Sequence, residues 1–491
     1  MLPMLCYVRL PFIMNIKLSP IKPIILFFLF ILNVPLCAQE EIDFIPEFQA
    51  SQSTFISSGV DLPFWMTTNQ NGVFILHNSS YQLSLVGLSR GLERDTLKKW
   101  GYTYGAKMVY GFADTSDIHP NEYWLGFRFH QLILKAGAQS DPIIYGGLSS
   151  TNGNMYRSRN ARAVPGLSLN TNGYIPFLFA KKWFSFRLLY EDGILKDKQF
   201  VIDAHLHHKY LYFRGLLSPA LSVSLGFEHY AFWGGYSPKY GRLPGWNQYF
   251  RSVFGLAGGK DAPHYDQTNG AGNQLGSYNL EVKKEWKTMS ITFYWNHPFE
   301  DRSGMELANI HDGLWGIYLK TNKRLSFITD IVYEYMYTLN QSGAIATHPA
   351  PTPEDPNRMT GRGQDDYFNH YIYTSGYTHY QRMMGTPLFV PEIGTDGISK
   401  GFESTRMWMH HLGVSGILGG GFFWKSLATW SRNFGTYKKA YPNPLDEFSF
   451  LAEGSYNGSK LPFMVKAGVA GDHGDRFEHR IGGYLGIEIN F

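Results

Sequence analysis

The segment from Ile481 to Phe491 limits the folds open to this chain more than any other stretch. Its odd positions carry apolar residues and one glycine, and its even positions carry small or polar residues. Alternate side chains of a β-strand point to opposite faces, so this pattern predicts a strand with one apolar and one polar wall. Ending on Phe491 is typical of the closing strand of an outer-membrane β-barrel, and a half-buried strand of a soluble sandwich is the alternative.

The same alternation recurs along the chain, in the ranges 102–112, 184–191, 200–207, 221–228, 289–296 and 325–337. Charged residues such as Asp330 and Glu334 lie on the less apolar face of these runs. An outward apolar band with aromatic girdles and a polar interior requires this arrangement, whereas a sandwich would need a partner sheet for each apolar face. We therefore predict an all-β fold, a large transmembrane antiparallel β-barrel of roughly 16–18 strands closed by the C-terminal strand that ends in Phe491.

The first 38 residues have the composition of a secretory signal peptide. Translation starting at Met14 would give a basic region, an apolar run from Ile24 to Val34 and a cleavage site near Ala38. A lipoprotein acylated at Cys37 is the alternative for this stretch. We expect residues 39–491 to form a single outer-membrane barrel domain. A helical membrane protein is excluded, because no second apolar run of about 18 residues occurs.

Composition excludes several classes of function. Both cysteines, Cys6 and Cys37, lie in the leader, so a mature chain cleaved after Ala38 has no disulfide or thiolate–metal chemistry. The chain has 44 Lys and Arg against 40 Asp and Glu; three of the basic residues lie in the leader, which leaves 41 against 40. This balance does not indicate a nucleic-acid partner. Aromatic residues make up 16% of the chain, which suits a large barrel.

Three stretches lack the alternation, near residues 143–174, 233–276 and 341–391, and they are rich in Gly, Asn, Pro or aromatic residues. Long irregular segments of a barrel are loops or plugs, where binding usually occurs. In the second stretch, sugar contacts are predicted for aromatic and hydrogen-bonding residues that lie close in sequence: Trp233, Tyr236, Lys239, Arg242 and Trp246. Aromatic faces pack on the C–H faces of sugars while polar groups bond the hydroxyls. An interfacial aromatic girdle is the alternative.

The third stretch carries the most specific motifs: Asn369, Tyr373, Ser375-Gly376-Tyr377, Arg382 and Gly385-Thr386-Pro387. Together with Pro63-Phe64-Trp65, Arg162, Pro165-Gly166 and the segment from Trp233 to Gly241, their order resembles the capsule assembly family Wzi. Tyr377 departs from the resemblance, which leads us to expect a tryptophan there.

The resemblance implies an outer-membrane barrel that binds capsular polysaccharide like a lectin and helps to organise it at the cell surface, without catalysis. We expect no cofactor. Its sugar contacts would add Asn369, Tyr373, Tyr377 and Arg382 to the five residues above. Capsular or extracellular polysaccharide, outer-membrane lipid and other capsule export proteins are the partners to consider.

Two other functions stay open. The first is a passive porin, which shares the architecture but has an open lumen. The second is a surface hydrolase or lyase, for which carboxylates are available at Asp365, Asp366, Glu392 and Asp396, although no G-x-S-x-G or H-E-x-x-H motif occurs. Histidines are clustered at His205, His207 and His208 and at His410-His411, but they lack a carboxylate at a ligand-like spacing, so we expect no metal site.

Overall fold

Long antiparallel strands dominate the computed structural model, which describes residues 46–95, 98–178, 183–259, 270–321, 326–344, 363–458 and 461–490. The expected leader and Phe491 lie outside these residues. Strands account for 56% of the described residues and helices for 6%, which confirms the all-β prediction.

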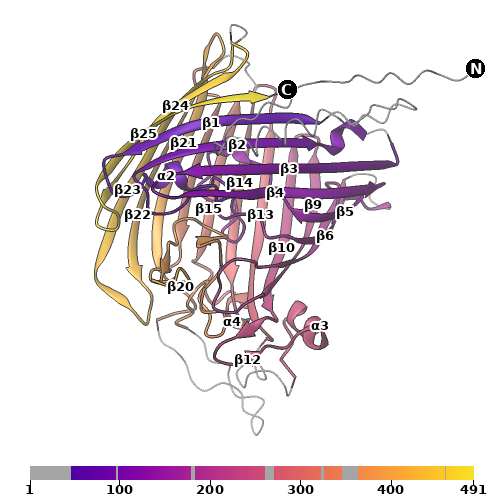
Figure 1. Ribbon diagram of the computed structural model, residues 1–491. Helices are drawn as coiled ribbons and strands as arrows, with labels where there is room; N and C mark the ends of the chain where they lie inside the picture. The colour runs from indigo at the N-terminus through magenta and orange to yellow at the C-terminus, as the bar shows by residue number, and fades with distance from the viewer. Residues whose placement is uncertain are drawn as a thin grey trace, which may run out of the picture. The chain divides into compact units, whose positions relative to one another are not determined.

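The barrel wall contains 18 strands that pair with their neighbours in chain order (Figure 1). They are β1 (Glu47–Ser57), β2 (Ser80–Arg90), β3 (Trp100–Phe112), β4 (Ser116–Phe129), β5 (Leu132–Ala138), β6 (Gly166–Thr171), β8 (Phe184–Ile194), β9 (His205–Ser218), β10 (Leu221–Trp233), β13 (Asn273–Glu285), β14 (Met289–Phe299), β15 (Gly313–Thr321), β16 (Asp330–Tyr337), β21 (Met407–Gly419), β22 (Phe422–Gly435), β23 (Ala440–Tyr456), β24 (Met464–Gly474) and β25 (Arg480–Asn490). The short β7 (Ile175–Pro176) adds a second pairing to β8.

The barrel closes where β1 meets the last strand. β1 pairs with β2 on one side and with β25 on the other, from Gln49 opposite Asn490 to Ser57 opposite Gly482. Because β1 pairs on both sides, the wall as described has no unpaired edge strand. Both the even strand number and the closing role of the C-terminal strand were predicted from the alternation, and both are confirmed.

The final strand also has the predicted two faces. Leu485 and Ile487 are exposed on the outside of the barrel. Tyr484 points inward, where its ring stacks on Phe55 at 5.0 Å between centroids, and Glu488 pairs with Lys466 at 2.7 Å. The alternation therefore separates a lipid-facing surface from a polar lumen.

The longest connections leave one end of the barrel. Short turns join β4 to β5, β9 to β10 and β21 to β22 at the end where the C-terminus lies, and the long loops gather at the opposite end (Figure 1). Outer-membrane barrels have short periplasmic turns and long extracellular loops, so the long-loop end is the extracellular end.

The helices are short and lie mostly in these loops: α2 (Phe64–Thr67), η2 (Tyr145–Gly147), η4 (Trp246–Gln248), α3 (Tyr249–Val253) and α4 (Arg302–Met305), with η1 (Leu92–Asp95) in a turn at the other end. Two-stranded pairs are formed by β11 (Tyr236–Ser237) with β12 (Gly241–Arg242), β17 (Thr378–His379) with β18 (Arg382–Met383), and β19 (Pro391–Ile393) with β20 (Ser399–Phe402). No helix in the described ranges is long and apolar enough to cross a membrane.

The structure corrects the sequence-based interpretation in two places. The run 200–207 was expected to be a strand with its apolar face toward lipid, but β9 begins only at His205, and Leu206 is buried on the inner side. Loop residues cover both sides of the wall here, so an apolar side chain is buried on the inner face, where a barrel usually has polar side chains. In addition, β6 lies within the predicted loop 143–174. Leu167 and Leu169 alternate there with Ser168 and Asn170, but the strand has only six residues.

Candidate functional site

The β5–β6 loop, residues 139–165, folds into the lumen and crosses it. The fully buried carboxylate of Glu334, on the inner face of β16, accepts hydrogen bonds from Ser149 Oγ at 2.5 Å and from the backbone N–H of Ser150 at 2.7 Å. Further along the loop, the N–H of Met155 donates to Asn296 Oδ1 on β14 at 2.9 Å. Backbone groups of the loop are thus satisfied by side chains of the wall, as burial requires.

Residues 363–406 of the β16–β21 loop pack against this first segment. Ser158 Oγ donates to the carbonyl of Gly385 at 2.5 Å, and Asn160 Nδ2 donates to the carbonyl of Met383 at 3.0 Å. Aromatic rings from both segments and the wall fill the space between them, including Tyr156, Tyr230, Phe368 and Tyr377. We call residues 139–165 and 363–406 together the plug.

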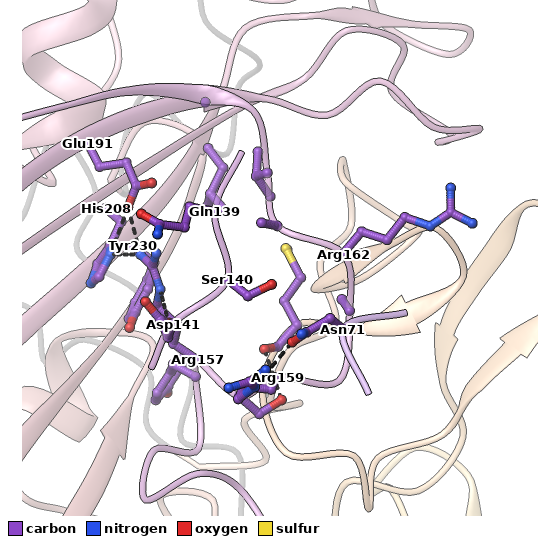
Figure 2. A pocket seen from close by; sticks show the side chains of 18 of the residues that line it. Asn71, Gln139, Ser140, Asp141, Arg157, Arg159, Arg162, Glu191, His208 and Tyr230 are labelled. Carbon is purple, nitrogen blue, oxygen red and sulfur yellow. Dashed lines mark hydrogen bonds and ion pairs between the residues drawn. The ribbon is translucent and has the colours of Figure 1, made fainter. Parts of the chain in front are cut away.

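A charged cluster joins the plug to the wall (Figure 2). Arg157 contacts Asp141 at 2.5 Å, Glu191 at 2.6 Å and Nδ1 of His208 at 2.6 Å. The cavity beside it has a volume of about 70 Å³, which is far below the several hundred Å³ of a typical ligand pocket. This cavity leaves no room for a sugar ring, whereas the same four residues also border a second lumen space of about 630 Å³. The cluster therefore fixes the plug to the wall.

A larger cleft of about 560 Å³ opens among the loops at the extracellular end. Its walls come from the β1–β2 loop, the plug segment around Arg382 to Ile393, and the ends of β23 to β25. The lining combines aromatic and charged side chains: Phe389, Tyr441, Phe477, Arg382, Arg476, Arg480, Asp61, Glu392, Glu403 and Glu478. Aromatic faces beside both donors and acceptors suit a hydroxyl-rich ligand. The cleft is our candidate binding site.

Two cations of the cleft are held by uncharged groups. Arg382 donates to the carbonyls of Thr67 at 3.1 Å and Phe74 at 3.3 Å. Burial, followed by the charge of Arg162, lowers the pKa of Arg382 to about 10, so its guanidinium stays protonated at neutral pH. Arg476 donates to the carbonyl of Leu388 at 2.7 Å. Within the described ranges, neither Arg382 nor Arg476 has a carboxylate at ion-pair distance.

The sequence-predicted sugar contacts fall into separate places. Tyr236, Lys239, Arg242 and Trp246 are exposed in the β10–β13 loop, with Tyr236 and Arg242 facing each other in the β11–β12 pair. Trp233 is only 2% exposed and lies on the outer wall, because it has the parity of the lipid-facing Leu225. It stacks on His205 at 4.2 Å and Nε1 donates to Asp192 Oδ1 at 3.2 Å.

Three predicted contacts are engaged within the plug. Asn369 uses both ends of its amide, donating to Asp366 Oδ1 at 2.8 Å and accepting from the N–H of Phe402 at 2.8 Å. Tyr373 donates to the carbonyl of Gly234 at 3.2 Å, which links the second and third predicted loops. Tyr377 is 2% exposed. Their contact with sugar stays a prediction, and in this structure they support the plug.

Of the nine predicted residues, Arg382 alone lines the cleft. Sequence reasoning did not select Arg476, Phe477 and Arg480, which directly precede or begin β25. Their position just outside the C-terminal strand was a usable sign, since residues at strand ends lie at the rim of a barrel.

The carboxylates considered for catalysis do not converge. Glu392 lines the cleft, whereas Asp365 is half-buried in the plug and accepts from Ser342 Oγ at 2.5 Å. Burial, followed by the charge of Asp301, raises the pKa of Asp365 to about 7. Burial also raises the pKa of Asp366.

The histidines are likewise divided by strand parity. His205 and His207 lie on the outer side of β9 and His208 on the inner side, and His410 and His411 are split in the same way on β21. In the part of the chain that the structure describes, no group of three or more His, Cys, Asp or Glu is arranged to hold a metal ion.

The family model for the capsule assembly protein Wzi matches residues 76–394, well over half of the sequence. The chain belongs to the Wzi capsule assembly family. No curated protein sequence matches it. The fold is similar to that of Escherichia coli Wzi, described as an outer-membrane protein involved in group 1 capsule assembly and a carbohydrate-binding β-barrel, with 14% identity, a TM-score of 0.56 and coverage of 90% of this chain and 84% of that one.

Two other barrels are less similar. Acinetobacter baumannii OccAB2 has 8% identity and a TM-score of 0.47, with 92% of this chain and 99% of that chain covered. Pseudomonas aeruginosa OccK3 has 13% identity and a TM-score of 0.44, with 91% and 95% covered. The Wzi family barrel described here is an outer-membrane protein, as its closed wall and apolar outer surface require.

Proposed function

We propose that this Wzi family barrel binds capsular or extracellular polysaccharide in the extracellular cleft and retains it at the cell surface without cleaving it. The observation that carries the proposal is the cleft itself, a rim site of about 560 Å³ that combines Tyr441, Phe389 and Phe477 with Arg382 and Arg476. The description of E. coli Wzi as a carbohydrate-binding β-barrel supports it.

The lining has the chemistry to recognise a sugar chain. Aromatic rings offer apolar faces, guanidinium groups donate to hydroxyl or uronate oxygens, and Glu392 and Glu403 accept from hydroxyls. Because both charges are present, the cleft suits a neutral or moderately acidic glycan. Tyr236, Lys239 and Arg242 are exposed at the same end of the barrel and would extend the contact along a polymer.

The plug argues against a passive porin. Residues 139–165 cross the lumen and are fixed to buried groups on several strands, including Glu334 and Asn296. An open diffusion channel needs a continuous aqueous path. Near silence in a planar bilayer is the expected result, and a steady large current would favour the porin.

Binding of the purified protein to capsular polysaccharide from its own strain tests the proposal, with an unrelated glycan as control and product sizing on the same samples. We expect selective binding with unchanged glycan length; shortened products would favour a hydrolase or lyase.

Variants then locate the site. Tyr441→Ala and Arg476→Gln should each weaken binding by about tenfold, which corresponds to about 1.4 kcal/mol. Arg432→Gln is the matched control, because Arg432 pairs with Asp446 on the outer wall and does not line the cleft. Full retention by both cleft variants, with loss in Arg242→Gln, would move the site to the β11–β12 pair.

A further inference from the structure

The β10–β13 loop contains a short segment that lies against the outside of the barrel. We call Trp246–Leu256, which includes η4 and α3, the outer-wall segment. It covers Asp192 on β8 and Lys209 on β9, which share strand parity with the outward-facing Tyr190 and Leu211. Figure 1 shows α3 at the long-loop end of the molecule, opposite the C-terminus.

Polar contacts fix the segment to this wall. Tyr249 OH bonds to Tyr190 OH at 2.7 Å and donates to Asp192, which also bonds His207 Nδ1 at 2.9 Å. The ammonium of Lys209 donates to the carbonyl of Val253. The wall therefore sets the orientation of α3, and Tyr249 and Val253 form a small buried cluster with Trp233 that is separate from the main core.

The opposite side of the segment exposes large apolar side chains. Exposed fractions are 71% for Trp246, 69% for Phe250, 61% for Phe254 and 54% for Leu256. Several exposed aromatic residues in a row, held by a fixed backbone, mark an interaction surface. Tyr249 of the same segment contacts Tyr190, whose side chain is exposed on the outer side of β8.

The charge of the loop narrows the identity of the partner. Over residues 234–272 the sequence has Lys239, Arg242, Arg251 and Lys260 against Asp261 and Asp266, and the outer-wall segment itself has Arg251 and no acidic residue. Apolar side chains beside basic groups are typical of segments that lie in a membrane interface and attract anionic headgroups.

We propose that the outer-wall segment is an interfacial anchor. Trp246, Phe250, Phe254 and Leu256 enter the headgroup boundary of the outer leaflet, and Arg251 lies against anionic phosphate groups. The anchor fixes the β10–β13 loop at the membrane surface. This inference depends on the outer-membrane barrel alone and is independent of polysaccharide binding.

Fluorescence quenching in vesicles tests the anchor. The full chain carries Cys6→Ser and Cys37→Ser, and a single cysteine at Phe250→Cys or Phe254→Cys is labelled with an environment-sensitive dye. Tyr236→Cys is the matched control, because Tyr236 is 53% exposed in the same loop but lies outside the segment. The protein is reconstituted in phosphatidylcholine and phosphatidylglycerol with brominated acyl chains.

We expect brominated lipid to quench the dye at positions 250 and 254 several-fold more strongly than at 236, and aqueous iodide to show the reverse order. Equal iodide access at all three positions would overturn the anchor. Replacing phosphatidylglycerol by phosphatidylcholine should reduce the lipid quenching; no change would overturn the role of the basic residues.

Discussion

Removal of the Glu334 carboxylate should release the plug while leaving the barrel intact. Glu334 accepts four hydrogen bonds, from Ser149 Oγ, from the N–H and Oγ of Ser150, and from Tyr294 OH at 2.6 Å. Three of these donors belong to the plug. The serine hydroxyls can rotate toward other acceptors, but the buried N–H of Ser150 is fixed by the backbone and would lose its partner in Glu334→Ala.

The size of the effect follows from those contacts. A hydrogen bond to a charged group contributes about 1.5–3 kcal/mol, and an unsatisfied buried donor costs about 1–3 kcal/mol. Because such contributions are not additive, we expect the attachment of the plug to weaken by roughly 4 kcal/mol. That change multiplies the open population by about a thousand. The wall keeps its 18 strands, so thermal unfolding of the barrel should change much less than the lifetime of the closed plug.

Single-channel recording in planar bilayers measures this opening. We expect a near-silent wild type and frequent current bursts for Glu334→Ala. Glu453→Ala is the matched control, since Glu453 is also an inward carboxylate but bonds Tyr484 and Lys425 of the wall. If Glu334→Ala were as silent as Glu453→Ala, this carboxylate would not hold the plug.

Two further outcomes test the plug. Burial and the charge of Asp301 raise the pKa of Asp365 to about 7, so the folded plug holds a proton that the unfolded chain releases near the ordinary pKa of an aspartate. The local stability of the plug should therefore fall as pH rises from about 4 through 7. Hydrogen exchange should show less protection of residues 363–406 at pH 8 than at pH 5, and Asp365→Asn should flatten this dependence. Gly413→Ala should displace the plug, because the new Cβ would lie 2.5 Å from the carbonyl oxygen of Leu148. Protease cleavage within residues 139–165 should therefore increase. Gly454→Ala should behave as wild type, because the space around its Cβ position is open.

The alternation of side chains along each strand was the part of the fold that the sequence could predict. A period of two in residues 481–491 requires only local geometry, and it correctly assigned Leu485 to the outside and Tyr484 to the lumen. Parity alone cannot identify what covers each face. Leu206 is buried because the plug lies inside the wall at that point, and His207 is buried because α3 lies outside it. Both covering segments are distant in sequence.

The site was harder to predict for the same reason. Aromatic and basic residues between 233 and 247 have the composition of a sugar site, but composition does not distinguish a loop that rises above the rim from one that returns along the outer wall. Trp233 follows the parity of β10 to the outside, whereas Arg382 reaches the cleft. The cleft is assembled from three parts of the chain, and no local pattern connects Asp61, Arg382 and Arg476.

Shared residues couple the cleft to the plug. Asn160 lies in the first plug segment and Met383 in the second; they are joined by a 3.0 Å hydrogen bond, and both line the cleft beside Arg382. A glycan that contacts this surface binds the plugged form better than a form in which the two segments have separated. Such a ligand must stabilise the plug by the same free energy that plug closure adds to glycan affinity. Glu334→Ala should therefore weaken glycan binding without touching the cleft, and saturating glycan should reduce its current bursts.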